Sequence, residues 1–247
     1  PKPLTPREYA AKIKAAAKGQ DALDAAEAGM RQTMAVQPGD FGTVTWRGTF
    51  ADDGDIVGAF DGYVGNDFDI VNSGLRGIRE IDPVTPGGRL TRQIVEDMDR
   101  GFDQSRLTAD AELWRGPGSG RGIFGDPDTW GDDLAGFEWS DSAYSSASAS
   151  KKVADRFTKD GGVRLRVLAP KGSKAVQLSE MPASGPGFMH AEEAEVLLGR
   201  GARYRVVKDR GWTEITHPTT HQKIRVRDLD VEVIVPDETP PLPWETK

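Results

Sequence analysis

The chain has 247 residues, no cysteine, and a formal net charge of −7 from 39 acidic and 32 basic side chains. A hydrophobic content of 37% can bury one sizeable core, so we expect one domain with an appendage. The missing cysteines exclude disulfides, thiolate metal sites and a cysteine nucleophile. The acidic balance argues against a strong nucleic-acid binder, and no apolar run is long enough to span a membrane.

The first 38 residues are predicted to form a helical arm or a linker. They are rich in Ala, Lys, Glu and Asp, and Thr5 and Glu8 flank a proline in the pattern of a helix start. Large apolar side chains are too sparse here for an independent core. The chain begins Pro-Lys-Pro without a visible signal peptide, so we expect a processed protein or a piece of a longer one.

Helices dominate the first part of the domain, which we place at residues 39–236. A strand is expected within Phe41–Phe50, followed by an amphipathic helix that begins at Ile56. Two more helices are expected over Phe68–Leu75 and Leu90–Phe102, the last with apolar residues on one face.

Short strands dominate the second part, after a long glycine- and aspartate-rich loop over Gly116–Gly136. The apolar runs alternate and are separated by turn residues; they lie at 163–167, 175–176, 195–198, 204–206, 224–226 and 231–235. This order predicts an α+β fold, in which a helical N-terminal part packs on a two-sheet antiparallel core.

Three smaller features complete the chain. Lys223, Arg225 and Arg227 alternate as on the solvated face of an edge strand, or as a small patch for an acidic partner. The Pro-rich tail, residues 237–247, is expected to be disordered or tag-like. Pro218 between His217 and His221 disfavours the helix that would bring both onto one face, so we expect no metal.

Two carboxylates, Glu193 and Glu195, stand two residues apart at the start of a strand-like run. On a strand both would share one face, where one can stabilise positive charge while the other handles a proton. The stretch Ala191–Leu198 also consists of strong helix formers ahead of Gly199, so a helix is the alternative.

Two further motifs precede this pair: Arg115 ends the run AELWR, and Ser146-Ala147-Ser148 precede the helix-like segment KKVADRF. Together the three resemble the Arg, Ser-Thr-Ser, Glu-x-Glu signature of mono-ADP-ribosyltransferases, most closely the arginine-modifying branch. The stretches Tyr63–Gly77 and Leu165–Leu178 also resemble that family, and the likeness covers about residues 40–236. Ala147 departs from the pattern, which has Thr there.

The resemblance implies that NAD is the co-substrate and that a protein arginine accepts ADP-ribose. It gives Glu195 the stabilisation of charge on the ribose and Glu193 the incoming guanidinium. Arg115 and Gly116 would contact NAD, with Arg115 on its diphosphate or a ribose oxygen, while Ser146 orients Glu195 and Ser148 stiffens the strand beside NAD.

The family also has an exposed aromatic residue in a target-recognition loop, for which Phe188 is the candidate; a buried core position is the alternative. An NAD glycohydrolase and a non-enzymatic module that keeps the fold remain alternative functions. The resemblance further implies a toxin-like or phage-associated protein, delivered as a secreted effector or carried in a virion, with an upstream domain as its carrier.

Overall fold

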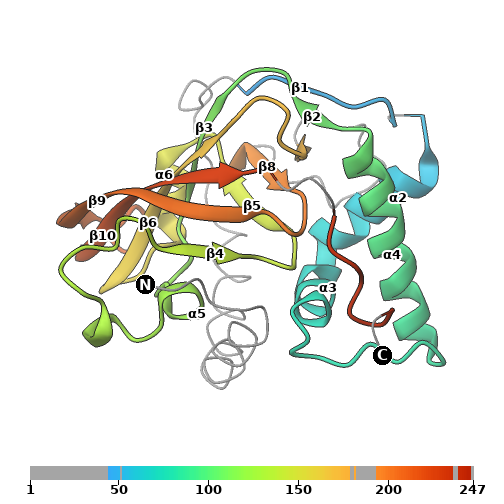
Figure 1. The fold of residues 1–247 in the computed structure, drawn as a ribbon, viewed down its shortest axis with the longest axis horizontal. Coiled ribbons are helices and arrows are strands. Elements are labelled where there is room, and N and C mark those ends of the chain that lie inside the picture. Colours follow the sequence, from blue (N-terminus) through green and yellow to red (C-terminus); the bar gives the residue numbers. More distant parts are fainter. Residues whose placement is uncertain (1–43, 51, 179–180, 182–192, 236–238, 246–247) are drawn as a thin grey trace.

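The computed structural model describes residues 44–50, 52–178, 181, 193–235 and 239–245. The helices are α2 (Gly54–Gly62), α3 (Phe68–Leu75), α4 (Pro86–Asp103), α5 (Arg121–Phe124) and α6 (Lys151–Phe157), with a π-helical segment η1 (Tyr63–Asp67) and a 3₁₀ turn η2 (Pro127–Thr129). Figure 1 shows a helical layer, formed by α2, α3 and α4, beside a strongly bent sheet.

The three predicted helices are confirmed as α2, α3 and α4, and local sequence explains where they begin. The Asp53 carboxylate caps α2 by accepting hydrogen bonds from the amides of Asp55 and Ile56. The Thr85 hydroxyl caps α4, whose first residue is a proline. The apolar face of α4 is buried, as its spacing predicted.

The strands are β1 (Trp46–Arg47), β2 (Arg106–Leu107), β3 (Ala111–Arg115), β4 (Glu138–Ser140), β5 (Ser145–Ser148), β6 (Gly162–Ala169), β7 (Ala175–Gln177), β8 (Glu195–Leu198), β9 (Arg203–Thr216) and β10 (Lys223–Ile234). β1 and β2 pair with each other, so the strand expected within 41–50 is two residues long in the described part of the chain.

The other strands form one continuous sheet in the order β4-β9-β10-β6-β3-β5-β8-β7. Its β6–β10 pair is parallel and the remaining pairs are antiparallel. The α+β class is therefore confirmed, but two separate antiparallel sheets are not found among the described residues. Alternation revealed which residues are strands and could not reveal which strands are neighbours.

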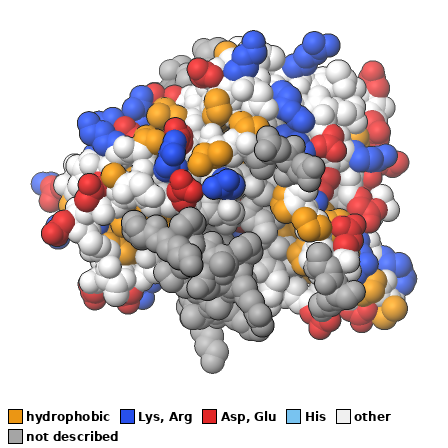
Figure 2. All heavy atoms as spheres, viewed as in Figure 1, with side chains coloured by type: hydrophobic (Ala, Val, Ile, Leu, Met, Phe, Trp, Pro, Cys, Tyr) orange, Lys and Arg blue, Asp and Glu red, His pale blue; other side chains and the backbone are white. Residues whose placement is uncertain are grey.

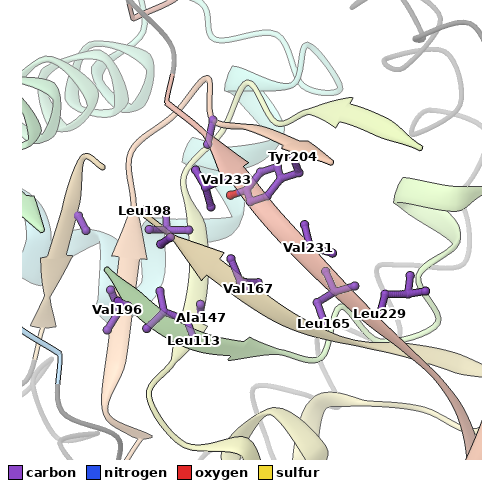
Figure 3. Packing of buried hydrophobic residues seen from close by; sticks show 14 of the residues in the cluster. Leu113, Ala147, Leu165, Val167, Val196, Leu198, Tyr204, Leu229, Val231 and Val233 are labelled. Carbon is purple, nitrogen blue, oxygen red and sulfur yellow. The ribbon is translucent and has the colours of Figure 1, made fainter. Parts of the chain in front are cut away.

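The bent sheet encloses one hydrophobic core and packs its other face on the helices through a second. Figure 3 shows the first core, with Leu113, Ala147 and Val196 from three adjacent strands packed together. The second core joins Phe60 and Phe102 of the helices to residues of the sheet that include Leu197. β8 is thus buried on both faces, and β5 lies beside it.

The expectation that the alternating basic residues mark an edge strand is wrong. β10 lies between β9 and β6, inside the sheet. Arg227 is buried and donates to the Asp209 carboxylate at 2.5 and 2.9 Å, while Arg225 lies over the Trp212 ring. Charges on a central strand need such partners because burial without them is costly.

The tail also differs from expectation, because residues 239–245 pack on the fold. Leu242 is buried in the core of the helical layer, and Arg92 of α4 lies over the Trp244 ring. Arg200 donates a hydrogen bond to the Pro240 carbonyl. Figure 1 shows this dark red segment running along α3 and α4. The tail packs because Leu242 and Trp244, which lie among its prolines, are apolar and can be buried against the helices.

Surface charge is mixed on the face seen in Figure 2, where acidic, basic and apolar side chains alternate. Among the described residues, no helix combines the length and apolarity that crossing a bilayer requires.

Candidate active site

The fold brings the three sequence motifs onto three adjacent strands. Arg115 ends β3, the serines lie on β5, and Glu195 begins β8; β5 lies between the other two. Within these pairs Ser148 is opposite both Trp114 and Glu195. Neighbouring motifs separated by about 30 to 50 residues in sequence are thus one strand spacing apart, roughly 5 Å, and Arg115 and Glu195 lie two spacings apart.

The two carboxylates do not share a strand face, so that part of the expectation is wrong. β8 begins at Glu195, and Ala194 before it has a φ of +43°, a left-handed conformation that L-residues other than glycine seldom adopt. Glu193 lies in a short helical turn, outside the alternation. The helical alternative is wrong for Glu195–Leu198, and residues 191–192 lie outside the described residues.

Glu193 and Glu195 differ in exposure as a result. Glu193 is 6% exposed and buried, whereas Glu195 is only partly buried at the start of β8. Ala194, in its left-handed conformation, turns the chain between them, so Glu193 lies in the turn and Glu195 lies on the strand. Glu195 is therefore the more accessible carboxylate of the pair.

The two serines differ in the same way. The Ser148 hydroxyl is buried; it donates to the Glu193 carbonyl oxygen at 2.6 Å and accepts from the Ser150 amide at 2.9 Å. Ser146 is exposed, and strand alternation puts it on the same face of the sheet as Glu195, diagonally across the β5–β8 pair. In the described residues no hydrogen bond joins the Ser146 hydroxyl to Glu195.

Arg115 is the last residue of β3, and Gly116 after it lies against helix α6. Arg115 is partly buried. A Cβ on Gly116 would lie 2.2 Å from the Ala154 carbonyl oxygen, so only glycine lets β3 end this close to α6. Phe188, the predicted recognition residue, lies outside the described residues.

A buried carboxylate that sequence reasoning missed lies beside these motifs. Asp141 accepts both arms of a guanidinium fork from Arg76, at 3.0 and 2.9 Å, and the Ser145 hydroxyl at 3.1 Å. Burial would raise the pKa of Asp141, but Arg76 and then Arg115 outweigh it and lower that pKa. Arg76 belongs to the family-like stretch Tyr63–Gly77, which was the one signal in the sequence that could have identified it.

Two tyrosines border the same charges. Burial raises the pKa of Tyr204 to about 12, although the positive charge of Arg115 lowers it in part. Burial also raises the pKa of Tyr63 well above its ordinary value; a hydrogen bond from Asn72 lowers it and the charge of Glu195 raises it further. Arg76 and Asp141 therefore lie within electrostatic range of both tyrosines, Glu195 within range of Tyr63, and Arg115 within range of Tyr204.

The described residues hold no group of three or more His, Asp, Glu or Cys side chains placed to bind a metal ion. His217 instead accepts hydrogen bonds from the amides of Thr219 and Thr220 at its Nδ1. Its Nε2 lies 3.1 Å from the Arg156 carbonyl oxygen, so both ring nitrogens are used inside the fold.

Comparison with known proteins decides the family. The family model described as "ADP-ribosyltransferase exoenzyme" matches residues 55–232, which reach from α2 into β10. The chain belongs to the ADP-ribosyltransferase exoenzyme family. The match includes Arg115, Ser146 and Glu195, and it leaves the docked tail outside. No curated protein sequence matches the chain.

Solved structures share the fold of this ADP-ribosyltransferase exoenzyme domain. One is C2-I, the enzymatic component of the C2 toxin from Clostridium botulinum: TM-score 0.55, 19% identity, over 74% of this chain and 44% of that one. Another is C3larvin, an ADP-ribosyltransferase toxin from Paenibacillus larvae: TM-score 0.50, 16% identity, over 73% and 88%. The chain thus spans less than half the length of C2-I, and at these identities the likeness is one of fold.

Proposed function

We propose that the chain is an NAD-dependent mono-ADP-ribosyltransferase that moves ADP-ribose from NAD to a protein arginine and releases nicotinamide. The observation that carries the proposal is the adjacency of β3, β5 and β8, which puts Arg115, Ser146 and Glu195 on three neighbouring strands. Family membership supports the reaction class; the arginine acceptor is supported only by the resemblance of Glu193-Ala194-Glu195 to the Glu-x-Glu motif of the arginine-modifying branch.

Glu195 stabilises the reacting ribose. Breaking the bond between nicotinamide and ribose builds positive charge on the sugar ring, as in the oxocarbenium-like state of glycoside hydrolysis. A carboxylate held on the end of a buried strand meets that charge without having to reorganise. Glu195 fits this role because β8 is buried on both sides while the Glu195 side chain remains partly exposed.

Arg115 and the serines hold the substrate and the carboxylate. Arg115 contacts the diphosphate or a ribose oxygen of NAD as a fork donor, beside Gly116. Ser146, exposed on the Glu195 face, orients Glu195 once NAD is bound. Ser148 has an indirect role. Its hydroxyl is hydrogen-bonded to backbone groups, so it fixes the turn that leads into β8.

Glu193 receives the acceptor. Arginine keeps its proton at neutral pH, so a nearby carboxylate helps to hold and deprotonate the guanidinium. The burial of Glu193 favours a second candidate, an NAD glycohydrolase, in which water attacks in place of a protein side chain. Both reactions use Glu195 in the same way.

We further propose that residues 39–236 are the catalytic unit and residues 1–38 a helical arm toward a delivery or virion domain. C2-I is by description the enzymatic component of a toxin, and C3larvin is described as a toxin. These descriptions support an effector that reaches a target cell, where NAD and an acceptor protein are its partners.

The test is incubation of the purified chain with labelled NAD and a cell lysate, followed by mass mapping of modified residues. We expect ADP-ribose on arginines of one or a few proteins. Nicotinamide release without any modified protein would favour the glycohydrolase, and no release at all would contradict both.

A further inference from the structure

Asp141 is held in place by hydrogen bonds of both its backbone and its side chain. Its amide donates to the Ala202 carbonyl at 3.0 Å, and its carbonyl accepts from the Gly201 amide at 2.8 Å. The segment after β4 is thereby fixed to the turn between β8 and β9, before the Asp141 side chain makes any contact.

The carboxylate of Asp141 then joins three parts of the fold. One oxygen accepts from Nε of Arg76 at 3.0 Å and from the Ala143 amide at 3.0 Å. The other accepts from Nη2 of Arg76 at 2.9 Å and from the Ser145 hydroxyl at 3.1 Å. Arg76 is the C-cap of α3 and Ser145 begins β5, so one side chain links the helical layer to the serine strand.

The side chains of Asp141 and Arg76 differ in exposure, and the difference would allow a ligand to reach the arginine. The Asp141 side chain is 5% exposed, whereas that of Arg76 is 22% exposed. A buried carboxylate that binds a partly exposed guanidinium fixes the position of the cation, which stays partly accessible to solvent. Arg115 adds a second positive charge within electrostatic range of Asp141.

A second fork of the same kind offers a comparison. Arg200, in the turn after β8, donates to the Asp99 carboxylate of α4 at 2.7 and 3.0 Å, and Tyr144 donates to the same group at 2.8 Å. This fork also joins a helix to the sheet, but its arginine is 6% exposed and also binds the tail carbonyl of Pro240. It has no accessible cation.

We propose that Asp141 is a positioning residue for NAD binding, which holds Arg76 and the start of the serine strand in the arrangement that receives the dinucleotide opposite Glu195. Asp141 itself touches no substrate. The inference rests on the proposed function, since it assigns Asp141 a part in the site that Glu195 and Arg115 form.

Pre-fixing the arginine matters because a free arginine side chain has many rotamers, and ordering them on binding lowers affinity. The fork removes that cost before NAD arrives. Small displacements of groups that contact a substrate have large kinetic effects, on the order of 10²-fold per ångström. Loss of Asp141 should therefore weaken NAD binding more than its effect on overall stability suggests.

The experiment compares Asp141→Asn with Asp99→Asn. Each replaces a carboxylate in an arginine fork between a helix and the sheet by its neutral isostere. Nicotinamide release gives kcat and KM for NAD, calorimetry gives Kd for NAD, and melting gives Tm. We expect both variants to lower Tm, and only Asp141→Asn to raise KM and Kd, by about tenfold.

Equal rises in KM for the two variants, or an unchanged KM in Asp141→Asn, would overturn the inference. Should Asp141→Asn not fold, Arg76→Lys keeps the charge but cannot form the fork; an unchanged KM in that variant would equally overturn it. If the unmodified protein neither binds NAD nor releases nicotinamide, the proposed function fails as well. If the unmodified protein turns over NAD and Asp141→Asn has the same KM, this inference is rejected and the proposed function stands.

Discussion

The Ser148 hydroxyl donates a hydrogen bond to the Glu193 carbonyl oxygen, 2.6 Å away, at the point where the chain turns into β8. The serine motif thus acts on the acidic motif through the backbone, one residue before Ala194 takes its left-handed conformation. The bond sets the direction in which Glu195 leaves this turn.

Ser148→Ala should therefore reduce both stability and activity. It leaves a buried carbonyl oxygen and a buried amide without this partner, at a cost of about 1–3 kcal/mol. Ser146→Ala is the matched control, because its exposed hydroxyl lies on the same strand. We expect Ser146→Ala to keep the melting temperature while nicotinamide release falls. A Ser148→Ala variant as stable as the parent would contradict the positioning role.

Glu193→Gln should separate the two candidate reactions. It should lose transfer to arginine and retain much of the NAD hydrolysis, because Glu195 still stabilises the ribose charge. Nicotinamide release and arginine modification are measured side by side. Parallel loss of both would place Glu193 in the NAD site, and retention of both would mean that Glu193 is not needed to receive the arginine.

Asp141 should contribute to stability only above its titration range. Its pKa is lowered in the fold from the ordinary 3.8, so the unfolded chain binds the proton more readily. The contribution is therefore complete above about pH 5 and is lost progressively as the pH falls below about 4 toward the lowered pKa. Urea titrations at several pH values should show a constant gap between parent and Asp141→Asn from pH 7 to pH 5, and a gap that narrows below about pH 4. A gap that stays constant below about pH 4 as well would count against the ion pair.

The docked tail predicts a difference between two glycines with nearly equal φ angles. Gly201 (φ +79°) faces Pro240, and a Cβ there would lie 2.2 Å from the proline ring. Gly211 (φ +77°) has open space around it. Both alanine variants carry the backbone strain, so Gly201→Ala should be less stable by an additional 1–3 kcal/mol or so. Thermal melting measures this, and removing residues 239–247 should abolish the difference.

Sequence patterns predicted the helices well because each carries its own signals. Thr85 and Pro86 mark the start of α4, and apolar side chains at helical spacing mark its buried face. The same kind of local pattern identified most of the strands, since alternation depends only on the residues of the strand itself.

The sequence-based predictions that were wrong or missing concern the residues that lie beside a strand or just before it. Arg227 alternates like a surface residue, yet its partner Asp209 comes from β9 and makes burial possible. Glu193 and Glu195 are two apart, but the left-handed Ala194 between them breaks the alternation. Asp141 gave no signal, because its importance arises from Arg76, 65 residues away.

The central claim is that Glu195 is the catalytic carboxylate, and nicotinamide release by Glu195→Gln tests it most directly. Glu214→Gln serves as the control, since Glu214 is an exposed carboxylate of β9 paired with Lys223. With both variants folded, we expect Glu214→Gln to turn over NAD like the parent and Glu195→Gln to be slower by about 10²–10³-fold. Turnover by Glu195→Gln at the rate of the parent would contradict the account.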